Sequence, residues 1–236
     1  MTTAHRLERL VVLGAGGHAR ELVDAVHAVN AVRPTWDLLG VLDDGDRPTE
    51  PGPEVGAPYL GPTSMVGMLD ARYVVGIGDG AVRERMDEMA RRASRTPATV
   101  VHPTASVGRR AVLHPGCYVA AHATLTTDCV LGRHTHVNVG ASVSHDDVLG
   151  AYCTLAPGAR LGGRAVLEDG VTLGLNCAVL PGVRLGAWSV AGAGATVTRD
   201  VQPGSVVVGT PAAVLRRAAE RVGTHRNVFG RLEVDE

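Results

Sequence analysis

Hydrophobic residues recur at every sixth position between Ala105 and Asp200, in sixteen consecutive hexapeptides. Fifteen of these recurring residues are Val or Leu, and the exception is Ala191. The residue two positions earlier is small in every repeat except one, where Asp147 stands. A period of six matches neither a helix face nor a half-buried strand. It is typical of a parallel β-helix, in which each hexapeptide supplies one short strand and one corner.

The repeat also predicts the dimensions of this β-helix. Three hexapeptides close one triangular coil of 18 residues, so the sixteen repeats form a little over five coils. Adjacent coils lie about 4.8 Å apart, which gives a prism roughly 25 Å tall. The recurring aliphatic residue points into the prism, and the small residue two positions earlier shares that face. No inserted loop interrupts the repeats, so the prism alone offers little surface for gripping an elaborate substrate.

Residues 1–98 follow a different pattern. Leu10–Leu13 reads as a short buried strand, the next five residues are Gly-Ala-Gly-Gly-His, and 21–29 has helical spacing. A strand, a glycine turn and a helix N-terminus form a cradle for anions, because backbone N–H groups point at the ligand. Ala19 and Arg20 stand where a third glycine of the dinucleotide fingerprint would be. A tight turn without a ligand is therefore the alternative.

Two further strands in this region end in residues suited to ligand binding. Residues 38–42 lead into Asp43 and Asp44, whose carboxylates suit ribose or sugar hydroxyls. Residues 73–77 lead into Gly78, and the following helix carries Arg83. Residues 45–62 are rich in Gly and Pro and read as a loop with one short strand. Three parallel strands ending at one edge predict a small Rossmann-like α/β domain with a shared crevice.

Composition narrows the function further. The net charge is −1, which gives no broad electrostatic case for nucleic acid or anionic membrane. All 23 basic residues are Arg, so mechanisms that need a Schiff-base or nucleophilic Lys are excluded. The sequence shows neither a spanning hydrophobic segment nor a signal peptide, and we expect a cytoplasmic protein. The four cysteines all fall in the small inward series, which predicts buried thiols rather than a disulfide or metal site.

His145 and Asp146 are the pair on the β-helix most suited to catalysis. They follow Val143 and fall at a predicted corner. One coil of 18 residues carries position 145 onto Gly163, so an imidazole and an unhindered backbone N–H stack about 5 Å apart. A general base beside an oxyanion donor is what acyl transfer needs, and Asp146 would hold the imidazole tautomer. An exposed corner histidine with a solvating carboxylate is the alternative reading.

These residues together resemble a known family. The chain is similar over nearly its whole length to the sialic acid O-acetyltransferases (NeuD) and the PglD-type sugar acyltransferases. The resemblance rests on six motifs: Gly14-Ala15-Gly16-Gly17-His18, Leu42-Asp43-Asp44, Ile77-Gly78 with Arg83, His102-Pro103, His145-Asp146, and Val208-Gly209-Thr210-Pro211-Ala212.

The resemblance implies a left-handed β-helix, a homotrimer, and acetyl-CoA bound between neighbouring prisms. It implies no metal. His145, Asp146 and Gly163 would be catalytic, and Asn138 would lie near the acceptor group. Implied contacts to the donor are Thr154, Gly163, Gly174, Leu175, Gly192 and Ala193. Implied contacts to a nucleotide-linked sugar are Gly14, Gly16, Gly17, His18, Asp43, Asp44, Gly78 and Arg83. The expected domains are 1–98, which binds the sugar nucleotide, 99–216, the acyltransferase β-helix, and a tail, 217–236.

Thr154 departs from the family pattern, because PglD-type members carry a second histidine nine residues after the base. A hydroxyl still donates one hydrogen bond but carries no charge, so the acyl donor's geometry is open. The leading hypothesis is N-acetylation of a nucleotide-linked aminodeoxy sugar, and O-acetylation of a sialic-acid-like sugar is second. Two other classes stay open: a zinc protein like the γ-type carbonic anhydrases, using His134, His136 and His145, and a non-catalytic sugar-nucleotide-binding subunit.

Overall fold

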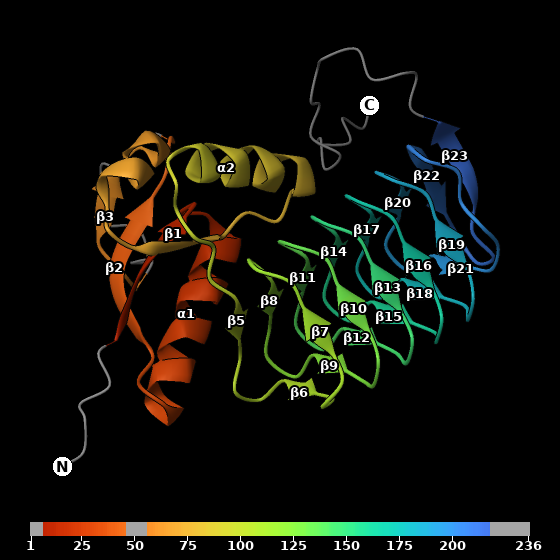
Figure 1. Cartoon of the computed structure of the whole chain (residues 1–236). Helices are drawn as coiled ribbons and strands as arrows, with labels where there is room; N and C mark the ends of the chain where they lie inside the picture. Colours follow the sequence, from red (N-terminus) through yellow and green to blue (C-terminus); the bar gives the residue numbers. More distant parts are fainter. Residues whose placement is uncertain (1–6, 46–55, 218–236) are drawn as a thin grey trace, which may run out of the picture.

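The computed structural model describes residues 7–45 and 56–217, which form two parts that pack against each other (Figure 1). The first part is a small α/β domain, and the second is a β-helix that carries its strands in three sheets, parallel throughout except for one antiparallel strand at the end of the first sheet. The tail predicted over 217–236 lies almost entirely outside the described residues. No helix in the described ranges is long and apolar enough to cross a membrane.

The N-terminal domain is built on a four-stranded parallel sheet of order β3-β2-β1-β4. Its elements are β1 (Glu8–Leu13), α1 (Gly17–Val32), β2 (Trp36–Leu42), β3 (Tyr59–Gly61), the 3-10 helix η1 (Thr63–Met68), β4 (Arg72–Val75) and α2 (Gly80–Arg92). Alternate residues of β1 face opposite layers: Leu10 and Val12 pack with α1, while Val11 and Leu13 pack with η1 and α2. The predicted Rossmann-like domain is confirmed, with the short helix η1 as an addition.

The β-helix follows the hexapeptide register throughout. Its first sheet contains β5 (Val100–Val101), β8 (Tyr118–Val119), β11 (His136–Val137), β14 (Thr154–Leu155), β17 (Thr172–Leu173), β20 (Val190–Ala191), β22 (Ser205–Val208) and β23 (Ala213–Arg217). The second contains β6 (Ser106–Val107), β9 (Thr124–Leu125), β12 (Ser142–Val143), β15 (Arg160–Leu161), β18 (Ala178–Val179) and β21 (Thr196–Val197). The third contains β7 (Val112–Leu113), β10 (Val130–Leu131), β13 (Val148–Leu149), β16 (Val166–Leu167) and β19 (Arg184–Leu185). We call these sheets faces 1, 2 and 3.

Each predicted inward residue is the second residue of its strand, and almost all of them are buried. Strands pair in parallel with partners one coil away, so Val130 faces Val112 on one side and Val148 on the other. The four cysteines are free and buried in the inward columns, as predicted. Burial raises the pKa of the Cys117 thiol to about 12, so it stays protonated and apolar.

The N-terminal domain covers the first coils of face 1. The outward residues of β5, β8, β11 and β14 are Val100, Tyr118, His136 and Thr154, and all four are buried. The next outward residue on this face, Thr172, is only half-buried. Helix α1 contacts β5, and the Tyr118 hydroxyl donates to Glu21 of α1. The α/β domain is therefore seated on one defined face of the prism.

Asp87 of α2 forms the centre of the contact between the two parts. Its carboxylate is fully buried and accepts hydrogen bonds from the Tyr73 and Tyr152 hydroxyls, from Arg133 at 2.7 and 2.8 Å, and from His134 Nε2 at 3.0 Å. Burial alone would raise the pKa of Asp87, but the hydrogen bonds from His134 and Arg133 outweigh it and hold the pKa well below its usual range. A fully satisfied buried carboxylate of this kind favours one orientation of the two parts.

Candidate active site

The corner between faces 2 and 3 carries the predicted base. Residues 144–147 form a tight turn in which Asp146 adopts φ +61°. The His145 Nδ1 lies 2.8 Å from Asp146 Oδ2, and both side chains are about half exposed. If Nδ1 carries the proton that Asp146 accepts, then Nε2 keeps a free lone pair. The structure therefore leaves the outer ring nitrogen available as a proton acceptor.

The imidazole of His145 lies over Gly163, as the spacing of 18 residues predicts. A methyl group on the Gly163 Cα would lie only 2.4 Å from His145 Nε2, so no larger residue fits beneath the ring in this position. The Arg164 N–H donates to the His145 carbonyl at 2.9 Å, which fixes the two corners relative to each other. The Gly163 N–H has no acceptor in the described part of the chain. A base and an unpaired backbone donor thus share one corner, as acyl transfer requires.

Asn138 lies at a different corner from His145. It follows β11, at the corner between faces 1 and 2, and its amide donates to the Leu155 carbonyl at 2.7 Å. The Ala141 N–H donates to the Asn138 carbonyl at 3.0 Å and closes this turn, and four residue steps of nearly extended chain, roughly 13 Å, then lead along face 2 to His145. One chain therefore does not bring Asn138 and the predicted base together.

Four of the six predicted CoA contacts lie on the corner that also carries Asn138, two coils further along, while Gly163 lies under His145 and Thr154 lies in β14. Gly174 and Leu175 stack on Gly192 and Ala193, one coil apart, and Leu175 is 52% exposed. A side chain on Gly174 would lie 2.6 Å from the Ala193 backbone nitrogen. The glycines therefore allow the two corners to stack closely and leave a smooth ridge of exposed backbone beside Leu175.

The glycine turn forms the N-terminal end of α1. Gly16 and Gly17 are exposed there, and no side chain caps the helix at Gly16. Gly14 has φ +113°, and a side chain on it would lie 2.9 Å from Ile77, so this glycine allows two sheet-edge turns to approach. An uncapped helix start with exposed glycines is suited to a phosphate group.

The two aspartates after β2 point to different partners. Asp43 accepts from the Ala15 N–H at 2.8 Å, so its carboxylate lies at the glycine turn. Asp44 accepts from the backbone N–H and the hydroxyl of Thr63, at 2.8 and 2.6 Å, and so fixes the start of η1. Gly78 is half-buried at the end of β4, with open space above its Cα. Asp43 thus lies at the glycine turn and Gly78 in the turn that follows β4, while Asp44 is engaged by Thr63.

His18 contacts a histidine that sequence reasoning did not assign to the site. Its Nε2 lies 2.9 Å from Nδ1 of His136, and its Nδ1 lies 3.4 Å from Glu21. Burial, with a contribution from Arg83, lowers the pKa of His18 and of His136, so both rings are neutral at pH 7. Donation from His136 to His18, and from His18 to Glu21, leaves only a lone pair unpartnered at the buried His136 Nε2.

Arg83 is positioned for a structural role, not for substrate. The side chain is fully buried, and its guanidinium donates to the carbonyls of His134, Ile77, Gly78, Tyr152 and Cys153 and to the Thr154 hydroxyl, at 2.8–3.0 Å. The Thr154 hydroxyl also donates to Gly78 at 3.0 Å. These bonds leave neither group free for a ligand. Arg83 is therefore not a predicted contact to the sugar nucleotide, and Thr154 is not a predicted contact to acetyl-CoA. Both bind the N-terminal domain to face 1.

The residues that a zinc site would need are also engaged elsewhere. His134 is stacked between Tyr73 and Tyr152 and bonded to Asp87, while His136 contacts His18. His145 lies at a different corner. Among the described residues, no group of three or more His, Cys, Asp or Glu is arranged to hold a metal ion. The carbonic-anhydrase-like hypothesis therefore has no support from the geometry.

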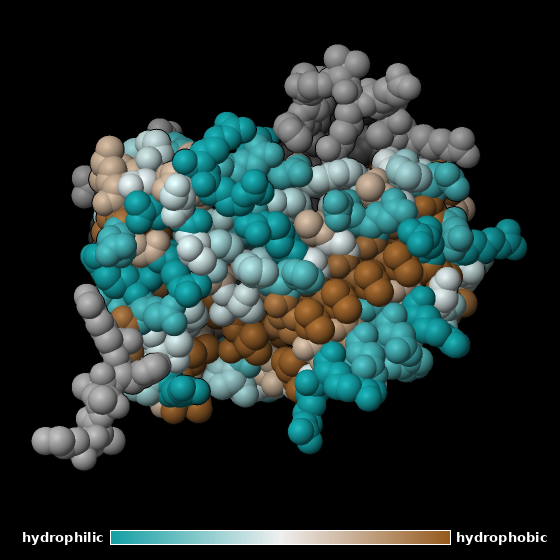
Figure 2. All heavy atoms as spheres, in the orientation of Figure 1, coloured by the Kyte–Doolittle hydropathy of each residue, from teal (hydrophilic) through white to brown (hydrophobic). Residues whose placement is uncertain are grey.

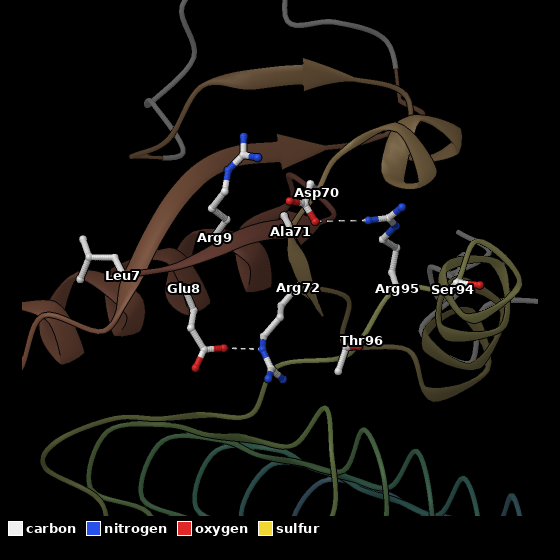
Figure 3. Close-up of a pocket in the computed structure, with 9 residues that line it drawn as sticks. All are labelled: Leu7, Glu8, Arg9, Asp70, Ala71, Arg72, Ser94, Arg95 and Thr96. Carbon is white, nitrogen blue, oxygen red and sulfur yellow. Dashed lines mark ion pairs between the residues drawn. The ribbon is translucent and has the colours of Figure 1, made fainter. Parts of the chain in front are cut away.

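A separate pocket of about 390 Å³ lies at the opposite edge of the N-terminal sheet, where β1 and β4 begin (Figure 3). Ion pairs join Glu8 to Arg72 and Asp70 to Arg95 across it (Figure 3). In open parallel sheets, ligands bind at the carboxyl ends of the strands. This pocket lies at the amino ends, away from the glycine turn, so we do not assign it to the active site.

Comparison with known proteins identifies relatives of both parts. The family model of the PglD N-terminal domain matches residues 9–90. The GDP-perosamine N-acetyltransferase of Escherichia coli O157:H7 is 32% identical over 101 residues, which cover 43% of this chain and 46% of the relative. The UDP-N-acetylbacillosamine N-acetyltransferase of Bacillus subtilis (strain 168) is 30% identical over 120 residues, covering 49% and 52%. Each match thus spans about half the length of the curated relative.

Two solved structures are similar over most of the chain. PerB from Caulobacter crescentus, in complex with CoA and GDP-perosamine, is 29% identical with a TM-score of 0.80, covering 89% of this chain and 98% of that one. The acetyltransferase domain of PglB from Neisseria gonorrhoeae FA1090, in complex with acetyl coenzyme A, is 28% identical with a TM-score of 0.81, covering 89% and 100%. Residues 9–90 therefore match the PglD N-terminal domain family, and the two-part fold is similar to both solved structures over most of the chain.

Proposed function

We propose that this protein transfers the acetyl group of acetyl-CoA to the amino group of a nucleotide-linked aminodeoxy sugar. The observation that carries the proposal is the His145 imidazole, oriented by Asp146 and lying over Gly163 with its unpaired N–H. The names of the relatives support N-acetylation, because both curated relatives are sugar N-acetyltransferases. The complexes of solved relatives with CoA support the donor.

In the proposed reaction, the amine nitrogen of the sugar attacks the thioester carbon of acetyl-CoA, and His145 Nε2 removes a proton from that nitrogen. The N–C bond forms, and the carbonyl oxygen becomes an oxyanion that the Gly163 N–H stabilises by a hydrogen bond. When the intermediate collapses, the C–S bond breaks, and the proton on His145 passes to the CoA thiolate. Asp146 stabilises the transient imidazolium, since its carboxylate accepts from Nδ1.

The sugar nucleotide is proposed to bind at the N-terminal domain. Its phosphates are placed at the uncapped start of α1, beside Gly16, Gly17 and His18, and Asp43 faces the same turn. His18 contacts β11 through His136, two residues before Asn138. The glycine turn therefore lies near the corner between faces 1 and 2. A sugar extending from it would reach Asn138 and the predicted CoA ridge at Leu175 and Ala193.

That arrangement requires a base from a neighbouring copy, because His145 lies across face 2 from Asn138. Face 3 supplies a surface for such a contact. Its outward residues Val112, Val130, Val148 and Val166 are stacked in register, and Val112 and Val148 are 49% and 44% exposed. Figure 2 shows the resulting hydrophobic stripe along the prism. By contrast, the outward residues on the first four strands of face 2 are Ser, Thr, Ser and Arg. We therefore infer a homotrimer with one composite site at each contact between copies.

The activity test follows release of CoA thiol from acetyl-CoA, with GDP-perosamine, UDP-linked and dTDP-linked amino sugars, and sialic acid as acceptors. We expect one nucleotide-linked amino sugar to be acetylated on nitrogen by the unmodified protein. His145→Asn is expected to lower kcat by about 10³-fold, the scale of a lost general base. His114→Asn is the control, because His114 is exposed at the corner between faces 3 and 1, away from both corners assigned to the reaction.

The outcomes separate the candidate functions. Acetylation of sialic acid alone would replace the N-acetyltransferase by an O-acetyltransferase. Binding of a sugar nucleotide without transfer to any acceptor would favour the non-catalytic subunit. Transfer that persists in His145→Asn would refute the assigned base. Light scattering tests the assembly: we expect a trimer for the unmodified chain and smaller species for Val148→Glu, with Ser106→Glu on face 2 as the control.

A further inference from the structure

Asp147 is the one acidic residue in the small inward columns of the β-helix, and its side chain is fully buried. The equivalent positions one coil away are Cys129 and Ala165, which are small and apolar as the repeat requires. An isolated carboxylate inside a solenoid is costly, so its hydrogen bonds decide whether it is tolerated there. The Asp147 carboxylate accepts two hydrogen bonds, and both come from backbone N–H groups at the candidate active site.

The two oxygens of Asp147 bind the two corners that form the site. Its Oδ2 accepts from the N–H of Ser144 at 2.6 Å, and Ser144 directly precedes His145. Its Oδ1 accepts from the N–H of Ala165 at 2.8 Å, and Ala165 closes the corner that contains Gly163. At the neighbouring corners that end at Ala141 and Ala159, the same backbone N–H donates instead to a carbonyl of its own turn. The bond from Ala165 to Asp147 thus joins successive coils.

We propose that Asp147 is a positioning residue that sets the spacing between the His145 imidazole and the Gly163 N–H. The inference rests on the proposed function, because the two groups must act on the same thioester carbonyl and its attacking amine. A rigid connection between them matters because displacing catalytic groups by about 1 Å can cost about 10²-fold in rate. Asp147 touches neither reactant in this proposal and acts only through the two corners.

The charge state of Asp147 makes the connection sensitive to pH. Burial raises the pKa of its carboxyl to about 6, although the N–H groups of Ala165 and Ser144 oppose the rise. The titratable groups around it are His145 and Asp146 on its own corner and Cys129 one coil away. A protonated carboxyl presents an O–H where an acceptor is needed, so one of the two backbone N–H groups loses its partner. Activity should therefore fall as the pH drops through about 6, and this part of the fall should be missing from a variant without the carboxyl.

Asp147→Asn tests the proposal, because an amide has the same shape but only one acceptor oxygen. We expect kcat to fall by about 10-fold or more at pH 7.5, with KM for acetyl-CoA and for the sugar nucleotide within twofold of the unmodified enzyme. The acid limb of log(kcat/KM) should be steeper in the unmodified enzyme than in the variant between pH 7 and 5. Cys129→Ala is the control for a change in the same inward column, and its kcat should stay within twofold.

Hydrogen exchange provides a readout that needs no substrate. We expect the amides of 143–147 and 162–166 to exchange at least 10-fold faster in Asp147→Asn than in Cys129→Ala, measured on the full chain. If Asp147→Asn has the same kcat, the same exchange rates and the same pH profile as the unmodified enzyme, the proposal is overturned and the proposed function is left intact. Absence of transfer by the unmodified enzyme would instead refute the proposed function. If the variant does not fold, the unmodified enzyme alone decides: an acid limb of log(kcat/KM) with a slope of about 1, which indicates a single titrating group, overturns the proposal.

Discussion

Replacing Arg83 by Lys tests whether this residue joins the two parts of the protein or binds substrate. Arg83 makes six hydrogen bonds to protein acceptors, and burial lowers the pKa of its guanidinium to about 10. The guanidinium has five N–H donors, one of which is shared between two acceptors, and a Lys ammonium has three, so at least two donors are lost. At about 1.5 kcal/mol for each bond from a charged donor, the loss amounts to about 3 kcal/mol.

The measurement is thermal unfolding together with KM for the sugar nucleotide. In a chain of this size, each kcal/mol lowers Tm by about 2–4 °C, so we expect Arg83→Lys to lower Tm by about 6–12 °C. KM should change less than threefold, because no N–H of Arg83 is free to bind a phosphate. Arg85→Lys, on the exposed side of the same helix, is the control and should leave Tm within about 2 °C. An unchanged Tm with a KM raised 10-fold or more would refute the structural role and restore Arg83 to the substrate site.

Two further predictions concern the site and its surroundings. Gly163→Ala should lower kcat by about 10²-fold, because its methyl group displaces the imidazole from above the donor. Tm should hardly change, because the half-exposed His145 side chain can rotate away. In a His145→Asn background, the same change should lower kcat little further. Chemical denaturation should show the free energy of unfolding falling by up to about 3 kcal/mol from pH 7.5 to 5.5. The pKa values of His18, His134 and His136 are lowered in the folded protein. Below about pH 6.5 the unfolded chain therefore binds protons on these residues that the folded protein does not. Asp147, whose pKa is raised to about 6, acts in the opposite direction but is one group against three, and His136→Phe should remove about a third of the dependence. A pH-independent stability, or a Gly163→Ala enzyme with normal kcat, would contradict these readings.

The stacking of His145 on Gly163 could be predicted because it depends only on the repeat. Once the coil length is 18 residues, every residue has a known neighbour in the next coil, and the strand register confirms it at Ser142 and Arg160. The same coil length accounts for the position of Gly174 and Leu175 next to Gly192 and Ala193, which only the family resemblance had singled out. It also indicated that Asp147 is unusual, since its column is otherwise small and uncharged.

The roles of Arg83 and Thr154 could not be read in the same way. Both were assigned to ligands by their place in motifs, yet their partners are backbone carbonyls on the other part of the chain. His136 was missed for a related reason. It is an outward residue on face 1, and nothing within its own hexapeptide indicates that His18 lies against it. The sole advance signal was the run of larger outward residues Val100, Tyr118 and His136, which is typical of a covered face.

The sequence alone therefore determined the β-helix, its inward columns, the Rossmann-like sheet and the pairing of His145 with Gly163. These features follow from short-range periodicity, in which each residue's environment is set by positions at fixed spacing. Only the tertiary structure decided that the N-terminal domain covers face 1 and that Arg83 and Asp87 join the two parts. The interdomain hydrogen bonds at Asp87, Arg83 and His18 join residues 46–118 positions apart, and they depend on the shape and hydrogen-bonding capacity of surfaces that no local pattern specifies.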